Sequence, residues 1–361
     1  MKILFISLEQ SGREILKTIL DNAFFTNNQF CINTFGLNEN YLNIKDLTNI
    51  NIKSIMGITD IFFNLFYLFK LRKNINTLIK SKNFTHIFFI DSFDFTKFYL
   101  NKFINKNISY YQIVGPSVFI WKKNRAKFIN KNISGLFSIF EIERSYYDPS
   151  IYNFIGHPLI SKVKLNYNFN GEIQNIGIFL GSRLQEISKN IKIIKELISK
   201  LEIKNSYKYY FFTTPSFDNL IKRNFSTIQN SKFILNNEDY YEKMSILDFA
   251  FACSGTVHLE LSFSHIPHFI FYKASSLNYF IFKYFVKSKF LSLINIFNKK
   301  LIVKEFVQEN FTSQKLFNSF IEMSDKEKLF QYRSTLITSL NNSNLKNYNP
   351  NIIIDYLKKF F

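Results

Sequence analysis

Short apolar runs rich in β-branched and aromatic residues alternate along the chain with longer segments whose apolar residues recur every three or four positions. The short runs lie at 2–7, 86–90, 110–114 and 136–140, and after His157-Pro158 they resume at 176–180, 207–213, 246–252 and 268–272. Such runs are typical of buried strands, and the periodic segments between them are typical of helices. The alternation predicts an α/β fold with two doubly wound, Rossmann-like domains that face each other across a cleft.

The domain boundaries follow from the same pattern. We expect the first domain over residues 1–165 and the second over 166–345, joined in the polar stretch 161–175, which lacks periodicity and holds Gly171. Residues 346–361 predict a C-terminal helix that packs back on the first domain or on a partner subunit. Because doubly wound sheets bind ligands outside the carboxyl ends of their strands, polar residues there are the first candidates for chemistry.

The composition excludes several classes of protein. Apolar residues make up 47% of the 361 residues, which excludes a disordered chain. No apolar run approaches the ~20 residues that a membrane-spanning helix needs, and the N-terminal run turns polar at Glu9, too early for a signal peptide. The two cysteines, Cys31 and Cys253, cannot form a disulfide framework, so we expect a cytoplasmic protein.

Residue spacing gives little support to a metal or a nucleic acid as partner. The five histidines show no ligand spacing with cysteines or carboxylates, so we expect no metal and no other cofactor. Basic residues exceed acidic ones by 46 − 27 = 19, yet the lysines are scattered along helices instead of gathering with aromatic residues on one face. The abundance of Phe, Lys, Asn and Ile also indicates AT-rich codons, so the charge alone is a weak argument. We expect no nucleic-acid partner, and a basic nucleic-acid-binding protein is kept as an alternative.

Two aspartates follow the predicted strand at 86–90. A carboxylate just past the end of a strand faces the crevice, where it can take a proton from a hydroxyl nucleophile. Asp at this position also commonly caps the next helix. We assign Asp91 to catalysis as the general base, and Asp94 to the helix cap.

Two turns of small residues stand at predicted strand ends in the second half of the chain. Gly181-Ser182-Arg183 precedes a helix that contains Glu186, and Ser254-Gly255-Thr256 precedes one that contains Glu260. Small residues let backbone N–H groups approach an anion, and Arg183 can add a bidentate clamp. Glu260 is placed to reach a ribose. Each turn alone is also common without a ligand, with Ser254 as an ordinary helix cap, but the pair favours a diphosphate. Neither turn matches a dinucleotide fingerprint or a Walker loop.

The segment 58–69 is rich in large apolar side chains, including Phe62, Phe66 and Phe69, and Lys70, Arg72 and Lys73 follow at once. An apolar stretch followed by basic residues is typical of a segment that rests on an anionic bilayer, and core packing is the alternative. We predict peripheral contact with an anionic bilayer through these three phenylalanines.

Taken in order, these segments resemble the lipid-A-disaccharide synthases, a bacterial family of glycosyltransferases with the two-domain GT-B fold. The resemblance runs along nearly the whole chain, and the ordered set of motifs is far more specific than any one of them. It is carried by Glu9-Gln10-Ser11-Gly12, Met56-Gly57-Ile58, Ile90-Asp91-Ser92-Phe93-Asp94-Phe95, Pro116-Ser117-Val118-Phe119-Ile120-Trp121, Phe154-Ile155-Gly156-His157-Pro158-Leu159, Gly181-Ser182-Arg183 with Glu186, Ser254-Gly255-Thr256 with Leu259-Glu260, Leu293-Ile294-Asn295, and Val303-Lys304-Glu305 with Gln308.

The resemblance implies an inverting hexosyltransferase that needs no metal and that lies on the cytoplasmic face of the inner membrane. It would transfer 2,3-diacylglucosamine from UDP-2,3-diacylglucosamine to 2,3-diacylglucosamine 1-phosphate (lipid X), forming the β-1,6-linked lipid A disaccharide 1-phosphate and UDP. Asp91 and Arg183 would be catalytic. The implied acceptor-side residues are Glu9, Ser11, Gly12, Asp94, Pro116, Ser117 and Trp121. The implied UDP-binding residues are Gly181, Ser182, Arg183, Glu186, Ser254, Gly255, Thr256, Glu260, Asn295 and Gln308.

The chain departs from the family pattern at a few positions. Leu8 replaces the family's first Gly, Arg13 stands where the family has Asp, and His258 replaces a small residue. The candidate base and the diphosphate residues are all present, so we expect an active enzyme. The alternatives are another GT-B enzyme acting on UDP-N-acetylglucosamine, namely an epimerase or a peptidoglycan glucosaminyltransferase, and a catalytically dead relative. A homodimer is compatible with the sequence.

Overall fold

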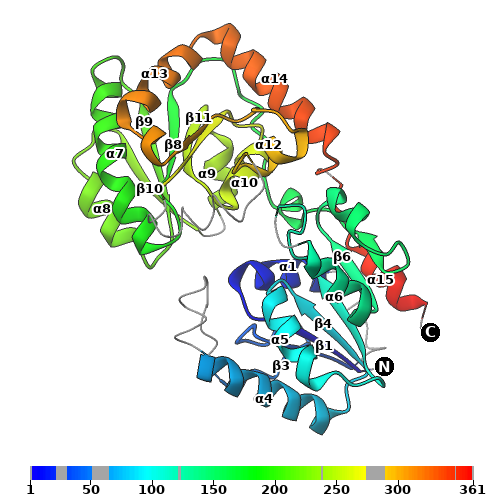
Figure 1. Ribbon diagram of the computed structural model, residues 1–361. Helices are drawn as coiled ribbons and strands as arrows, with labels where there is room; N and C mark the ends of the chain where they lie inside the picture. Colours follow the sequence, from blue (N-terminus) through cyan, green and yellow to red (C-terminus); the bar gives the residue numbers. More distant parts are fainter. Residues whose placement is uncertain are drawn as a thin grey trace. The chain divides into compact units, whose positions relative to one another are not determined.

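The computed structural model describes residues 2–21, 31–50, 65–120, 123–236, 239–273, 289–345 and 347–359. The chain forms two compact units: unit 1 comprises Met1–Pro158 and Asn347–Phe361, and unit 2 comprises Leu159–Lys346 (Figure 1). Unit 2 thus begins seven residues before the boundary that we expected at 165/166. The C-terminal residues belong to unit 1, so the chain leaves this unit once and returns to it.

Unit 1 is built on a parallel sheet of seven strands in the order β3-β2-β1-β4-β5-β6-β7. Its strands are β1 (Lys2–Ser7), β2 (Cys31–Phe35), β3 (Lys45–Asp46), β4 (His86–Ile90), β5 (Ser109–Ile113), β6 (Gly135–Ser138) and β7 (Tyr152–Phe154). Its described helices are α1 (Gln10–Leu20), α4 (Leu65–Lys82), α5 (Phe93–Phe103), α6 (Asn124–Asn132), the 3-10 helix η1 (Glu141–Tyr146) and α15 (Asn351–Lys358).

Unit 2 repeats this plan with six parallel strands in the order β10-β9-β8-β11-β12-β13. Its strands are β8 (Asn175–Phe179), β9 (Lys208–Thr213), β10 (Ser231–Leu235), β11 (Phe249–Cys253), β12 (His268–Tyr272) and β13 (Glu305–Val307). Its described helices are α7 (Leu184–Glu202), α8 (Asp218–Phe225), α9 (Tyr240–Ser245), α10 (Val257–Phe263), α12 (Leu293–Asn298), the 3-10 helix η3 (Gln308–Asn310), α13 (Ser313–Met323) and α14 (Lys326–Asn342). A short 3-10 helix, η2 (Pro158–Ser161), lies where the two units join in sequence.

The strands are apolar on both sides because helices cover both faces of each sheet. In unit 2, Ile178 belongs to a core formed with α7 and α13, whereas the next residue, Phe179, packs with α9 and α10 on the other face. In unit 1, Tyr110 packs into the core with α4, α5 and α6, and Tyr111 stacks on Phe88 of β4 at 4.4 Å. Each buried aromatic side chain of this kind contributes roughly 1.5–3 kcal/mol through burial.

The predicted strands are present, with boundaries that shift by up to three residues. The strand predicted from residue 246 begins at Phe249, because the helical stretch α9 extends to Ser245. Val114, predicted as the end of a strand, has a φ of 65° and lies outside β5. β2, β3, β7, β10 and β13 were not predicted.

Helix α15 packs on unit 1. The Tyr356 hydroxyl donates to the Ser134 carbonyl oxygen at 2.8 Å, and the Tyr356 ring meets Phe137 edge-on at 5.3 Å. The backbone N–H of Asn349 donates to the carbonyl oxygen of Ile155 at 2.8 Å.

The strand order of each sheet reverses beside its first strand. β1 lies between β2 and β4, and β8 lies between β9 and β11. Connections leave such a neighbouring pair in opposite directions, which opens a crevice at the carboxyl ends of the strands. Asp91 follows β4 in unit 1, and in unit 2 the turns 181–183 and 254–256 follow β8 and β11. The motifs that we singled out therefore stand at the two topological switch points.

Candidate active site

In unit 1, Asp91 is held rigidly at the switch point. Its Oδ2 accepts a hydrogen bond from the Ser11 hydroxyl at 2.6 Å, and its backbone N–H donates to Ile113 at 2.9 Å. Asp91 and Ser92 have φ values of 57° and 41°, a left-handed conformation that non-glycine residues rarely adopt. Strain of this kind costs of order 1–3 kcal/mol and persists where surrounding contacts enforce it. The turn presents the Asp91 carboxylate at the start of α1.

Two further acceptor-side residues close around this turn. Glu9 accepts a hydrogen bond from the Ser92 hydroxyl at 2.8 Å. Gly12 brings α1 close to β4, since a Cβ at this position would lie 2.8 Å from Ser7 Oγ and 3.1 Å from the Ile90 carbonyl oxygen. Glycine is therefore needed here for close approach.

Asp94 has a different role from the cap that we expected. It lies inside the first turn of α5, where both of its carboxylate oxygens accept from the Arg125 guanidinium at 2.7 Å. The Arg125 guanidinium also lies 5.4 Å from the Phe93 ring centre. Asp94 thus ties α5 to α6, and the helix-cap prediction is wrong because Ser92 occupies the cap position.

A buried glutamine, which the sequence analysis missed, links Asp91 to the loop after β5. The Gln112 amide donates to the carbonyl oxygens of Asp91 and Val114 at 2.8 and 3.0 Å, and its oxygen accepts from Thr96 at 2.9 Å. The loop that it supports carries Pro116 and Ser117, both predicted on the acceptor side. Trp121, predicted beside them, lies outside the described residues.

Beneath this loop lies a second missed group, Glu143, with a side chain only 1% exposed. Burial raises the pKa of Glu143 to about 8, against an opposing effect of the hydrogen bond with Ser138. Ser138 Oγ lies 2.6 Å from Glu143 Oε2 and 3.1 Å from the Phe140 carbonyl oxygen. The Ser138 hydroxyl has one hydrogen but lies close to two oxygens. A protonated Glu143 accounts for both contacts, because Glu143 can donate to Ser138 while the Ser138 hydroxyl donates to the Phe140 carbonyl oxygen. A Cβ at Gly115 would lie 2.9 Å from Glu143 Oε2, so the carboxyl directly supports the loop.

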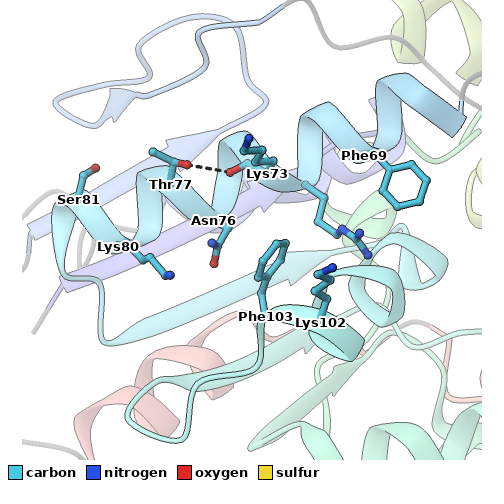
Figure 2. Close-up of a pocket in the computed structure, with 9 residues that line it drawn as sticks. Phe69, Lys73, Asn76, Thr77, Lys80, Ser81, Lys102 and Phe103 are labelled. Carbon is cyan, nitrogen blue, oxygen red and sulfur yellow. Dashed lines mark hydrogen bonds between the residues drawn. The ribbon is translucent and has the colours of Figure 1, made fainter.

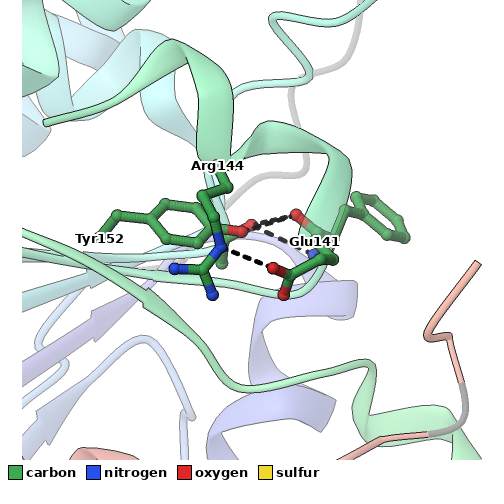
Figure 3. A network of polar contacts seen from close by, with 5 residues as sticks. Glu141, Arg144 and Tyr152 are labelled. Atoms are coloured by element: carbon green, nitrogen blue, oxygen red, sulfur yellow. Dashed lines mark hydrogen bonds and ion pairs between the residues drawn. The ribbon is translucent and has the colours of Figure 1, made fainter. Parts of the chain in front are cut away.

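Neighbouring polar contacts fix helix η1, which carries Glu143. Figure 3 shows Arg144 paired with Glu141 beside Tyr152. The ion pair measures 2.6 Å, and the Tyr152 hydroxyl donates to the Phe140 carbonyl oxygen at 2.9 Å.

In unit 2, the turn after β8 is organised by Glu186. Its carboxylate accepts from the Ser182 backbone N–H at 3.2 Å and from Arg183 Nη1 at 2.5 Å. Gly181 has a φ of 116°, and a Cβ there would lie 2.9 Å from Glu186 Oε2, so glycine is required. The predicted UDP-binding residue Glu186 therefore holds the turn, and it leaves Arg183, with a side chain 53% exposed, at the rim.

The turn after β11 is anchored by His258. The His258 Nδ1 donates to the Gly255 carbonyl oxygen, and its Nε2 accepts from the backbone N–H of Leu293 at 3.2 Å. These partners assign the neutral tautomer with the proton on Nδ1, and burial lowers the pKa of His258 to about 4. His258, one of the residues that depart from the family pattern, thus connects the turn 254–256 to the start of α12.

The two turns of unit 2 line a common cavity of about 200 Å³. Glu260 borders it, with the hydroxyls of Tyr240 and Tyr241 at 3.4 and 3.5 Å from its carboxylate oxygens. Burial raises the pKa of Glu260 to about 7. Other polar and apolar groups of the lining are Phe179, Gly181, Ser182, Glu186, Phe212, Thr213, Thr214, Asn236, Ser254, Gly255 and Thr256. The cavity combines a turn suited to an anion with a carboxylate suited to hydroxyl groups.

Other groups of the protein occupy every hydrogen-bonding position of the Asn295 side-chain amide. Its nitrogen donates to Val303 and Glu305 at 2.8 and 2.7 Å, and its oxygen accepts from the backbone N–H groups of Ile302 and Val303, both at 2.8 Å. These bonds occupy both donor hydrogens and both lone pairs, so no part of the amide is left for UDP. The prediction that Asn295 contacts UDP is therefore replaced by a role in holding the loop at 300–303. Gln308 follows β13 as the first residue of η3, with a φ of 53°.

The structure describes the predicted membrane segment only from residue 65 onward, so Phe62 lies outside the described residues. Phe66 is 84% exposed and Phe69 45%. Arg72, which we expected to face an anionic interface, is only 8% exposed, because Phe98 and Phe69 flank its guanidinium.

The described ranges contain no helix that is both long and apolar enough to cross a bilayer. They contain no group of three or more His, Cys, Asp or Glu side chains arranged to hold a metal ion. Cys31 and Cys253 are both free thiols, the first exposed and the second buried.

Two helix-covered parallel sheets in one chain are typical of the two-domain GT-B fold, and solved structures share this fold. S. aureus MnaA in a co-structure with UDP aligns with a TM-score of 0.66 at 11% identity, covering 99% of this chain and 96% of that one. Acinetobacter baumannii MurG aligns with a TM-score of 0.57 at 9% identity, covering 99% of each chain.

Sequence comparison narrows the class to one family. The family profile described as Lipid-A-disaccharide synthetase matches residues 3–350. Lipid-A-disaccharide synthase of Campylobacter jejuni is 31% identical over 296 residues, covering 77% of this chain and 78% of the relative. That of Helicobacter acinonychis is 28% identical over 291 residues, covering 77% and 79%. The chain belongs to the lipid-A-disaccharide synthase family, and it is a glycosyltransferase.

Proposed function

We propose that this chain transfers 2,3-diacylglucosamine from its UDP ester to the 6-hydroxyl of 2,3-diacylglucosamine 1-phosphate, and so forms a β-1,6-linked disaccharide 1-phosphate and UDP. Family membership supports this reaction. The observation that carries it is the position of the motifs, with a fixed carboxylate at one switch point and paired small-residue turns at the other.

Asp91 is proposed as the general base. The acceptor hydroxyl must lose a proton as it attacks the anomeric carbon, and a positioned base typically contributes ~10²–10⁴-fold to the rate. The Ser11 hydroxyl and the strained backbone at 91–92 orient the Asp91 carboxylate. Glu9, Gly12 and the loop with Pro116 and Ser117 would form the acceptor side around it.

The unit 2 cavity is proposed to bind UDP. Its turn 254–256 and the N-terminal end of α7 offer backbone N–H groups to the diphosphate. Glu260 is placed for the ribose hydroxyls, and Arg183 would leave Glu186 to stabilise the departing diphosphate.

Contact with a bilayer is part of the proposal, because both substrates are lipids. The exposed Phe66 and Phe69 support peripheral attachment through unit 1, at the cytoplasmic face of the membrane. A homodimer stays a prediction.

The test is an assay of the purified protein for UDP release that depends on both lipid substrates. Asp91→Asn should lower kcat ~10²–10⁴-fold with unchanged UDP affinity, because the amide keeps the size of the side chain but takes no proton. Asp94→Asn is the matched control on the same helix start and should lose far less activity. Near-normal kcat in Asp91→Asn would exclude the assigned base. Conversion of UDP-N-acetylglucosamine without an acceptor would instead favour an epimerase.

A further inference from the structure

A strongly basic groove lies between α4 and α5 on unit 1, apart from every residue assigned above to catalysis or UDP binding. It has a volume of about 750 Å³, and the described residues of its lining include Arg72, Lys73, Lys80 and Lys102 but no carboxylate. Figure 2 shows Lys80 extending from α4 and Lys102 from the end of α5 toward the same space, with Phe103 between them. Within the described ranges, none of the four cations forms an ion pair with an acidic side chain.

Arg72 marks the inner wall of the groove, and no carboxylate among the described residues pairs with its charge. Its guanidinium lies 3.8 Å from the Phe98 ring centre and 4.9 Å from that of Phe69, and it donates to the Phe98 carbonyl oxygen at 3.0 Å. Burial lowers the pKa of Arg72 accordingly. A buried cation with only neutral partners is costly, and an anion in the groove would offset that cost.

Apolar side chains adjoin the same wall. Phe69 precedes Arg72 by one turn of α4, and Phe66 precedes it by two, with exposed fractions of 45% and 84%. The groove therefore presents cations for an anionic headgroup and aromatic rings for the chains attached to it. Its volume lies in the range of small-molecule sites, roughly 300–1,000 Å³.

We propose that this groove binds the phosphate headgroup of an anionic glycerophospholipid of the bilayer, with Lys73, Lys80, Lys102 and Arg72 around the phosphate and Phe66 and Phe69 against the acyl region. The proposal rests on the proposed function, since an enzyme with lipid substrates must work at a bilayer. It adds a defined headgroup site. If the bilayer attracted the positive charge of the whole protein instead, every exposed lysine would contribute about equally to vesicle binding.

Vesicle sedimentation tests the groove with the full-length protein. The probes are phosphatidylcholine vesicles with and without phosphatidylglycerol, and the variant is Lys73→Gln/Lys80→Gln/Lys102→Gln. Each basic residue near an anionic leaflet strengthens binding about fivefold, so the triple variant should bind phosphatidylglycerol vesicles about 100-fold more weakly. The matched control, Lys192→Gln/Lys204→Gln/Lys328→Gln, removes the same charge from exposed sites on unit 2 and should lose much less. Equal losses in the two variants would refute the headgroup site.

Two further measurements distinguish a lipid headgroup site from a site for soluble phosphate and from an effect on catalysis. Inorganic phosphate and glycerol 3-phosphate should leave vesicle binding intact at equal ionic strength, and displacement by either at low concentration would show a site for soluble phosphate instead. The groove variant should keep its kcat on detergent-dispersed substrates. If the unmodified protein binds the vesicles through the groove but transfers no sugar, the proposed function fails while the groove stands.

Discussion

Replacing Glu143 by Gln should change how the stability of unit 1 depends on pH. Burial raises the pKa of Glu143 to about 8 from an ordinary value of 4.5. In the unfolded chain the carboxyl loses its proton near the ordinary value, whereas the folded protein keeps the proton until the higher pH. Because the folded state binds this proton more tightly, the associated stability is fully present below the lower pKa and is lost as the pH rises through the window between the two values.

The size of the effect follows from the same two values. One pKa unit corresponds to 1.36 kcal/mol, so the loss between pH 5 and pH 8 amounts to about 4 kcal/mol, an order-of-magnitude figure for one buried group. Gln does not titrate, yet its amide can donate to Ser138 as the protonated acid does. Glu143→Gln should therefore leave stability nearly unchanged at pH 5 and raise it relative to the unmodified protein as the pH rises toward 8.

Thermal unfolding at several pH values between 5 and 8 measures this difference, with circular dichroism as the readout. Glu141→Gln is the control, because Glu141 lies two residues away on the same helix but pairs with Arg144 near the surface. Its Tm should follow that of the unmodified protein at every pH. Parallel curves for Glu143→Gln and the unmodified protein would refute the reasoning, since they would show that Glu143 does not keep its proton in the folded state.

Substitutions at Arg183 and His258 test unit 2. Arg183→Ala should weaken UDP binding about 10–100-fold and also lower kcat, because a charge-assisted bond to phosphate contributes roughly 1.5–3 kcal/mol. Calorimetry with UDP measures the change in affinity. Unchanged UDP affinity would show that Arg183 does not contact the diphosphate. His258→Ala should lower Tm and raise KM for the UDP-sugar, because the Leu293 N–H and the Gly255 carbonyl oxygen lose their partner. Burial lowers the pKa of His258 from 6.5 to about 4, so the unmodified protein should lose stability as the pH falls from 6.5 to 4. His258→Gln should flatten this dependence, which thermal unfolding at several pH values measures.

The sequence predicted the parts of the fold that a local pattern encodes. β4 was found with its observed bounds because a run of apolar residues ends abruptly at Asp91, and the same contrast located the turns at Gly181 and Ser254. β2 was missed, since Cys31–Phe35 mixes Asn and Thr with apolar residues and lacks a clear period. Strand order, which brings the turns after β8 and β11 together, depends on pairing between distant segments and has no local signal.

The supporting residues of the site were harder to find. Gln112 and Glu143 are polar residues within or beside apolar strands, and only their three-dimensional partners distinguish them from surface residues. Asn295 was assigned to the ligand because of its motif, whereas its hydrogen bonds all serve the protein. Arg72 was assigned to the surface because a basic residue after an apolar run usually lies there, but three nearby aromatic rings bury it.

The return of α15 to unit 1 has a consequence for synthesis on the ribosome. Residues 159–346 are contiguous, so unit 2 can fold as soon as its own chain has emerged. The strands of unit 1 are made first, but the faces of Tyr111 and Phe137 that Tyr356 covers stay open until the segment with α15 has been synthesised. The first half of the polypeptide therefore has to wait, partly assembled, while another unit is translated. During that interval the aromatic surface that α15 covers in the folded unit is exposed to water.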